Sequence, residues 1–230
     1  WHPDMFWDGS VDHILTQPLR PITDPVEMDE KPERIVEKLN SNATYRNMFK
    51  RAFGSETATV ENTFKALAQF MGAMISDNSK YDKHMRGENE GSLTVAESNG
   101  LNLFRTHCAS CHKEPLFTDF SFRNNGLPPD PVFNDKGRGI VTGKDEDNYR
   151  FKVPSLRNVG VTRPYMHDGR FETLEQVLEH YDNGIHNAPN LDPFLTNGIA
   201  LTENEKKDII SFLHTLTDHT FIKDSRFAEP

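Results

Sequence analysis

The two cysteines of this 230-residue chain, Cys108 and Cys111, lie three positions apart and are followed directly by His112. A C-x-x-C-H string of this kind is the attachment signature of c-type haem. Its two thiols can form thioethers with the two vinyl groups of one haem, and the histidine can then bind the iron. The sequence therefore predicts one covalently bound haem c on these three residues.

Two other uses of such a cysteine pair are a thioredoxin-like dithiol and half of a zinc site. A dithiol of that class needs a βαβ context, and the pattern around the motif does not provide one. A zinc site would need a second pair of cysteines, and the chain has no further cysteine. Haem attachment is therefore favoured, and it implies a compartment outside the bacterial cytoplasm, most simply the periplasm.

The ligand on the opposite side of the haem iron is not marked by the motif itself. Methionine, histidine, tyrosine or an open position are the usual choices. Met166 is the only methionine after His112 and lies in the string TRPYMHDGRF. Tyr181 falls on the apolar face of a predicted helix, where a packed tyrosine is the ordinary interpretation. Most of the ten histidines, including His180, are expected at the surface, and spacing alone leaves this ligand open.

The elements that must position these residues are predicted to be helices. Apolar residues recur at spacings of three and four, and Thr173 and Thr202 stand where N-caps are expected, the latter in a capping box with Glu205. The predicted helices cover about 32–40, 43–53, 57–74, 94–106, 173–181 and 202–216. Residues 1–30 and 113–160 have no sustained period and show no convincing paired strands. The expected fold class is mainly α, with long loops and little β structure.

Charge and hydropathy argue against two classes of partner. The chain has 26 Lys and Arg against 35 Asp and Glu, a formal net charge of −9, and no broad basic cluster, so a nucleic-acid partner is not expected. No apolar run approaches the roughly 18–20 residues of a membrane span. The polar stretch from Asp77 to Ser92 is typical of a linker, and it is the predicted domain boundary.

Five strings in one order along the chain carry a resemblance to a known family. Together they resemble the bacterial dihaem cytochrome c peroxidase/MauG family over essentially the whole chain. The strings are FWDGS (6–10), PVEM (25–28), FRTHCASCH (104–112), KVPSLRNV (152–159) and TRPYMHDGRF (162–171). The resemblance implies cytochrome c-like haem domains, two in a complete member, each with its own C-x-x-C-H motif.

This sequence contains one such motif rather than two. The expectation is that it begins partway through the first domain. Residues 1–88 would then be the remainder of the first, peroxidatic, haem domain, and 89–230 the second haem domain with its C-terminal helix. A monohaem relative, or a first domain supplied by a cleaved partner chain, is the other interpretation. One haem c is thus expected in this chain and two in the full-length protein.

The resemblance implies a periplasmic oxidoreductase that reduces hydrogen peroxide. Electrons would come from a small cytochrome or cupredoxin and be relayed through this haem. A close variant uses peroxide to oxidise a partner protein instead. The alternative from another class is an electron-transfer cytochrome c with no catalysis of its own. Family peroxidases are often dimers, so a homodimer is a further expectation.

Three residues of the first 30 match positions with roles in the family. Trp7 matches a tryptophan between the two haems that carries electrons, although a core anchor is the commoner use of tryptophan. Glu27 matches a glutamate beside the peroxidatic haem that moves a proton during peroxide reduction, while a surface carboxylate is the ordinary alternative. Gln17 matches a glutamine near the same pocket.

Further matches concern ions and the haem itself. Thr162 and Pro164 match residues whose backbone carbonyls bind calcium between the domains, and oxygen ligands suit that ion. Arg157 could pair with a haem propionate, or it could form a structural ion pair. In the family the sixth ligand lies fifteen residues beyond the position held here by Met166, which is Tyr181. Peroxidases have methionine there and MauG-like members tyrosine, so Tyr181 is predicted ahead of Met166.

Overall fold

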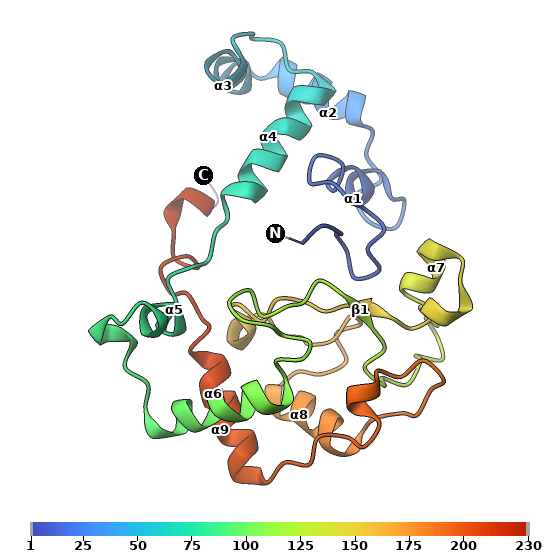
Figure 1. Cartoon of the computed structure of the whole chain (residues 1–230). Helices are drawn as coiled ribbons and strands as arrows, with labels where there is room; N and C mark the ends of the chain where they lie inside the picture. The colour runs from blue at the N-terminus through green and yellow to red at the C-terminus, as the bar shows by residue number, and fades with distance from the viewer. Residues whose placement is uncertain (1, 229–230) are drawn as a thin grey trace. The chain divides into compact units, whose positions relative to one another are not determined.

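The computed structural model describes residues 2–228, which fold into helices joined by long irregular segments (Figure 1). The chain divides into two units, one of residues up to Met5 and Val11–Ile75, the other of Phe6–Ser10 and Ser76 onward. The only regular sheet of the described residues is a pair of two-residue strands. The predicted fold class, mainly α with little β, is confirmed.

The first unit contains four helices, and its caps explain where they start and stop. They are α1 (Leu19–Thr23), α2 (Pro32–Ser41), α3 (Ala43–Phe53) and α4 (Val60–Ala73). The side chain of Asn42 accepts from the backbone N–H of Thr44 at the start of α3, and Gly54 ends that helix in the left-handed conformation. Because Gly lacks a Cβ atom, this conformation is unstrained there. Thr59 caps α4, so this helix begins at residue 60 rather than near 57 as predicted.

The second unit holds the C-x-x-C-H motif. Its longer helices are α6 (Val95–His107), α8 (Leu174–Asn183) and α9 (Glu203–His214). Its short elements are α5 (Lys80–Met85), η1 (Asn89–Gly91), β1 (Phe122–Arg123), α7 (Arg138–Thr142), η2 (Asp145–Asp147), β2 (Phe151–Lys152), η3 (Val159–Val161), η4 (Pro193–Leu195) and η5 (Ser225–Phe227). The strands are antiparallel, with Phe122 opposite Lys152. The segment predicted as one long loop, 113–160, therefore contains several short elements.

Each of the three longer helices starts with a complete capping box. The threonine accepts from the third backbone N–H of the helix, and the side chain of that residue accepts from the backbone of the threonine. The pairs are Thr94 with Glu97, Thr173 with Gln176, and Thr202 with Glu205. The predicted caps at Thr173 and Thr202 are therefore confirmed.

The core of the second unit lies where α6 crosses α9 (Figure 1). A Cβ atom on Gly100 would lie 2.0 Å from the backbone oxygen of Asp208, so only glycine lets the two helices approach this closely. Aromatic rings fill the space beside the crossing: Tyr81, Phe104, Phe117 and Phe212 are buried and pack edge-on or tilted against one another. This core supports the end of α6, from which the motif continues.

The boundary between the two units differs from the prediction. It lies at Ile75/Ser76 rather than near residue 88. The polar stretch is tied into the second unit, because Tyr81 is 1% exposed and the backbone N–H of Asn78 donates to Asp218 at 2.9 Å. Gly91 lies so close to the backbone of His84 that a Cβ atom would be 2.1 Å away. The stretch from Asp77 to Ser92 has the composition of a linker, but its contacts are with the core of the second unit.

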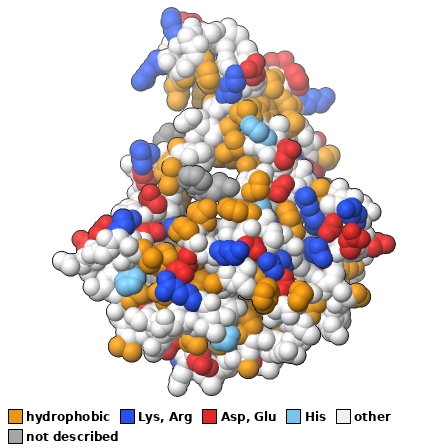
Figure 2. Space-filling model, viewed as in Figure 1, with side chains coloured by type: hydrophobic (Ala, Val, Ile, Leu, Met, Phe, Trp, Pro, Cys, Tyr) orange, Lys and Arg blue, Asp and Glu red, His pale blue; other side chains and the backbone are white. Residues whose placement is uncertain are grey.

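The surface carries both signs of charge. On the face shown in Figure 2, acidic and basic side chains are interspersed and form no continuous basic area. Among the described residues, no helix combines the length and the apolar character that a membrane crossing requires.

Candidate haem-binding site

The C-x-x-C-H motif forms a helical turn directly after α6. Cys108 is the C-cap residue of that helix, and its carbonyl oxygen accepts from the backbone N–H groups of Cys111, at 3.2 Å, and His112, at 2.9 Å. Residues three and four apart in such a turn lie on one side of it. The turn therefore presents two thiols and an imidazole together.

Two backbone carbonyls determine which ring nitrogen of His112 carries the proton. Its Nδ1 lies 3.0 Å from the oxygen of Phe117 and 3.2 Å from that of Pro154. Since carbonyl oxygens only accept hydrogen bonds, the proton is on Nδ1 and the lone pair on Nε2. Burial lowers the pKa of His112 and keeps the ring neutral. A neutral imidazole oriented in this way is prepared to bind a metal ion through Nε2.

The pKa values of the two thiols do not suit a redox-active dithiol. Both thiols are free, and burial, with a smaller contribution from Cys111, raises the pKa of Cys108 to about 12. Burial also raises the pKa of Cys111. Redox-active cysteines have lowered pKa values, because the thiolate is the nucleophile. Across residues 2–228, no three His, Cys, Asp or Glu side chains gather as a metal site.

Tyr181 lies near the end of α8, close enough to the motif to interact with it electrostatically. Burial raises the pKa of its hydroxyl to about 12; a hydrogen bond from Asn125 opposes this shift, and Cys111 and Cys108 add to it. The helix is anchored by its neighbour His180, which is 5% exposed and lies 3.0 Å through Nε2 from the oxygen of Asn125. His180 is thus buried, and the prediction of a surface histidine was wrong.

Met166, the other candidate iron ligand, contacts the side-chain amide of Asn125. It is partly buried, and its Sδ accepts a hydrogen bond from Nδ2 of Asn125 at 3.5 Å. Its φ of 71° is unusual for a residue with a long side chain, so the surrounding loop determines this backbone conformation. The structure thus holds the Met166 sulfur against the side chain of Asn125.

These residues fit a covalently bound haem. Cys108 and Cys111 would form the thioethers, His112 would bind the iron, and Tyr181 or Met166 would take the opposite position. The fit rests on the two free thiols in one turn and on the neutral imidazole whose Nδ1 is bonded to two carbonyls.

A buried ionic cluster beside the motif was not predicted. Arg123 bonds to Asp119 and to Asp192, each at 2.5 Å, and its charge acts on Cys111. Asp192 is 69 residues from Arg123, so no local pattern could have connected them. The cluster joins the strand after the motif to the segment beyond α8.

Arg157 forms a structural ion pair with Asp82. Its Nη1 and Nη2 each lie 2.9 Å from an oxygen of Asp82, and the same nitrogens donate to the carbonyl oxygens of Ser76 and Pro115. The ion pair joins the start of α5 to the segment before η3. The propionate role that the family implies for Arg157 stays a prediction.

Trp7 is not a core anchor. Its side chain is 39% exposed, while its backbone oxygen accepts from Lys152 at 2.8 Å. Gly9 packs against Phe122 so closely that a Cβ atom would lie 2.3 Å from the ring, which fastens this segment to the second unit. The electron-carrying role of Trp7 stays a prediction.

The two other predicted residues of the N-terminal region belong to the first unit. Glu27 is exposed, in a turn after α1 where its backbone N–H donates to Asp24 at 3.1 Å. Gln17 is partly buried in the turn before α1, and its N–H donates to His13 at 3.1 Å. Both stay predictions, as do Thr162 and Pro164, which are exposed between η3 and α8.

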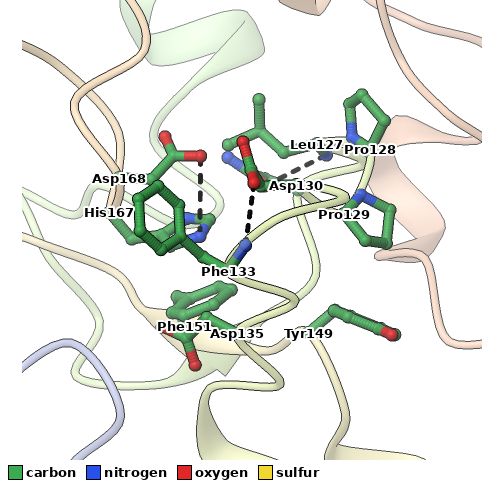
Figure 3. Close-up of a pocket in the computed structure, with 11 residues that line it drawn as sticks. Leu127, Pro128, Pro129, Asp130, Phe133, Asp135, Tyr149, Phe151, His167 and Asp168 are labelled. Carbon is green, nitrogen blue, oxygen red and sulfur yellow. Dashed lines mark hydrogen bonds and ion pairs between the residues drawn. The ribbon is translucent and has the colours of Figure 1, made fainter.

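A pocket of about 390 Å³ is lined by His167 and Asp168, which follow Met166 directly in the chain (Figure 3). His167 stacks on Phe151 in its wall, with ring centres 3.5 Å apart, and burial lowers the pKa of this histidine. Asp130 and Asp168 line the same space, as does Asn125. The C-x-x-C-H residues do not line this pocket. Asn125 does line it, and its side chain also donates a hydrogen bond to the sulfur of Met166.

Comparison with known proteins places the chain in a family. The model of the di-haem cytochrome c peroxidase family matches residues 1–90. The chain is 36% identical to methylamine utilization protein MauG of Methylorubrum extorquens, aligning 94% of this chain with 61% of the relative. It is 34% identical to cytochrome c551 peroxidase of Nitrosomonas europaea, over 92% of this chain and 61% of the relative.

The structural comparison agrees. A crystal structure of a MauG-like protein associated with microbial copper homeostasis superposes with a TM-score of 0.89 at 32% identity, covering 100% of this chain and 76% of that one. The chain thus spans about 61% of the length of the two curated relatives and most of the solved one. The sequence motifs, the helical fold and these matches together show that the chain belongs to the di-haem cytochrome c peroxidase family.

Proposed function

We propose that this chain is the haem c-bearing part of a periplasmic peroxidase-type oxidoreductase. The overall reaction would be the reduction of hydrogen peroxide by two electrons and two protons to two molecules of water. The observation that carries the proposal is the turn of Cys108, Cys111 and His112, with Nδ1 of the histidine bonded to two carbonyls and Nε2 left for iron. Relatives named as peroxidases support the reaction type.

The haem supplies reversible electron storage, and the chain's own residues supply orientation and proton transfer. Burial keeps His112 neutral, and the Phe117 and Pro154 carbonyls fix the direction of its ring. Glu27, as an exposed carboxylate in a turn, is proposed to transfer a proton between the peroxide oxygens. Trp7, with its exposed indole, is proposed to carry electrons between haems. Gln17 is proposed to assist Glu27 by orienting the bound peroxide.

The identity of the second iron ligand would influence whether the haem relays electrons or takes part in the oxidation of a partner protein. Tyr181, if it holds the haem as a tyrosinate, would stabilise the ferric form and lower the reduction potential, whereas Met166 would raise it. Tyrosine is proposed as the ligand because the family's ligand position, fifteen residues beyond Met166, is Tyr181. Tyrosine ligation would favour oxidation of a partner protein over simple electron relay, and one relative bears the name MauG.

A non-catalytic electron-transfer cytochrome is the second candidate, favoured by the single C-x-x-C-H motif. The ratio of haem to protein in the full-length, mature product separates the two. Two haems per protein support the enzyme. One haem, with no turnover of peroxide, would support the cytochrome.

The direct test of catalysis is Glu27→Gln in the full-length protein. We expect turnover of peroxide to fall by roughly 10² to 10⁴, the usual share of a general acid or base. Haem content and Tm should match the wild type, because Glu27 is exposed. Glu33→Gln, an exposed carboxylate in the first turn of α2, is the matched control and should leave turnover unchanged. Equal turnover of both variants would remove Glu27 from the mechanism.

Calcium is a further part of the proposal. The backbone carbonyls of Thr162 and Pro164 are proposed to bind it, in an exposed segment that leaves room for water ligands. A structure of the full-length protein grown with calcium should show the ion on these carbonyls, and its absence there would refute the site. The electron donor is proposed to be a small cytochrome or cupredoxin, and the full-length protein is proposed to form a homodimer.

A further inference from the structure

Two short segments supply the carbonyls that face His112. Phe117 is the middle residue of 116–118, and Pro154 is the middle residue of 153–155. Their oxygens lie 3.0 Å and 3.2 Å from Nδ1 of the histidine, so one N–H is shared between two acceptors. Because two carbonyl oxygens that converge on one proton repel each other, both segments must be held in place.

Two side-chain hydroxyls join these segments, one from each. Oγ1 of Thr118 donates to the carbonyl oxygen of Val153, and Oγ of Ser155 donates to that of Leu116, each at 2.6 Å. Each bond therefore runs from the residue after one middle residue to the residue before the other. Since the outer carbonyls accept from hydroxyls, the carbonyls of the two middle residues are the ones directed at His112.

The backbone does not join these segments in the way that a sheet would. Pro154 has no N–H to donate, and the N–H of Thr118 donates to the oxygen of Lys113 at 3.2 Å. Phe117 has a φ of 55°, which takes it out of the extended conformation of a strand. The two hydroxyl bonds therefore replace ladder bonds beyond the end of β2.

Burial stabilises this arrangement on the side of Phe117. The ring of Phe117 is fully buried and packs edge-on against Tyr81, with ring centres 4.9 Å apart. Thr118 and Val153 are buried as well, whereas Ser155 is exposed. A left-handed φ costs energy for a residue with a large side chain, so the packed ring and the buried hydroxyl bond must together maintain it.

We propose that Thr118 and Ser155 are positioning residues: their hydroxyls hold both carbonyls at Nδ1 of His112, and the shared hydrogen bond sets the reduction potential of the haem that this histidine binds. This inference rests on the proposed haem site. A hydrogen bond at Nδ1 fixes the direction of Nε2 and makes the imidazole a better electron donor to the metal. Better donation favours ferric iron, so this hydrogen bond lowers the potential.

The test measures the reduction potential of the full-length, haem-loaded protein with Thr118→Val or Ser155→Ala. Each change removes one hydroxyl donor, the first at similar volume. We expect each variant to raise the potential, so that at a fixed applied potential the ratio of ferric to ferrous haem falls by roughly two- to tenfold, the worth of one ordinary hydrogen bond. Thr118→Ser and Ser155→Thr keep the hydroxyl, and their potentials should stay close to that of the wild type.

Thr215→Val is the matched control, because Oγ1 of Thr215 forms an equally short, buried hydrogen bond, 2.6 Å from the oxygen of Phe212 at the end of α9. Its potential should stay that of the wild type even if its Tm falls. The inference is overturned if either Thr118→Val or Ser155→Ala keeps the wild-type potential, or if Thr215→Val raises it equally. If Thr118→Val binds no haem, Ser155→Ala decides alone.

A separate assay of peroxide turnover distinguishes this inference from the proposed function. Shifted potentials in a protein that carries haem but does not reduce peroxide would refute the peroxidase proposal and support this inference. Reduction of peroxide together with unshifted potentials would refute this inference alone.

Discussion

The ion pair of Asp82 and Arg157 offers a sharp test of how the second unit is held together. The side chains are 10% and 14% exposed, and two hydrogen bonds of 2.9 Å join them. Asp82 also completes the capping box of α5 with Ser79. The change we propose is Asp82→Asn, which preserves size and an acceptor for the cap but removes the negative charge.

The expected loss follows from the charge that remains. Removing one partner of a buried pair costs about 3–5 kcal/mol, because the other charge is left uncompensated. Since asparagine retains one acceptor for Arg157, we expect the lower end, about 3 kcal/mol. For a unit of this size each kcal/mol lowers Tm by about 2–4 °C, so Tm should fall by about 6–12 °C.

The effect should also depend on pH. Burial alone would raise the pKa of Asp82, but hydrogen bonds from Arg157 and Ser79 outweigh it and hold the pKa below its usual range. A carboxyl with a lowered folded-state pKa stabilises the fold above its unfolded pKa, about 3.9, and loses that contribution as the pH falls through the folded value. The difference in Tm between wild type and Asp82→Asn should therefore be largest at neutral pH and become smaller in acid.

Thermal unfolding of the haem-loaded protein, followed from pH 7 into acid, measures both effects. Glu90→Gln is the matched control, because the Glu90 side chain in the same region is 77% exposed and pairs only with Lys83. Exposed pairs of this kind contribute little, so its Tm should be nearly unchanged. A Tm for Asp82→Asn equal to that of the control at pH 7 would refute the structural role of the ion pair.

Two further predictions concern the haem ligand and the helix crossing. Tyr181→Phe should change the ferric spectrum and raise the reduction potential, while Met166→Leu should do neither; the reverse pattern would identify a His/Met haem. Gly100→Ala should destabilise the second unit by about 1–3 kcal/mol, because the new Cβ would lie 2.0 Å from the oxygen of Asp208. Gly72→Ala on α4, where nothing lies within 4 Å, should not lower Tm in the same thermal unfolding experiment, and equal Tm values for the two glycine variants would contradict the close crossing.

The features that the sequence alone determined are local ones. The C-x-x-C-H turn needs only residues 108–112, and its geometry follows from backbone hydrogen bonds within that turn. The starts of α8 and α9 follow from threonine caps three residues from their partners, Gln176 and Glu205. Such signals are readable because both partners lie within one turn of the same helix.

Tertiary structure decided the features that join distant parts of the chain. The composition of residues 77–92 indicated a linker, yet Asp82 pairs with Arg157, 75 residues away, and draws this stretch into the core. His180 is buried because its ring reaches Asn125, 55 residues earlier, which no periodicity of α8 encodes. The sequence could name Tyr181 and Met166 as rivals, but only the fold places the amide of Asn125, 41 residues earlier, against the Met166 sulfur. A hydrogen-bond partner across such separations depends on how whole elements pack, and that information is absent from any local pattern of residue types.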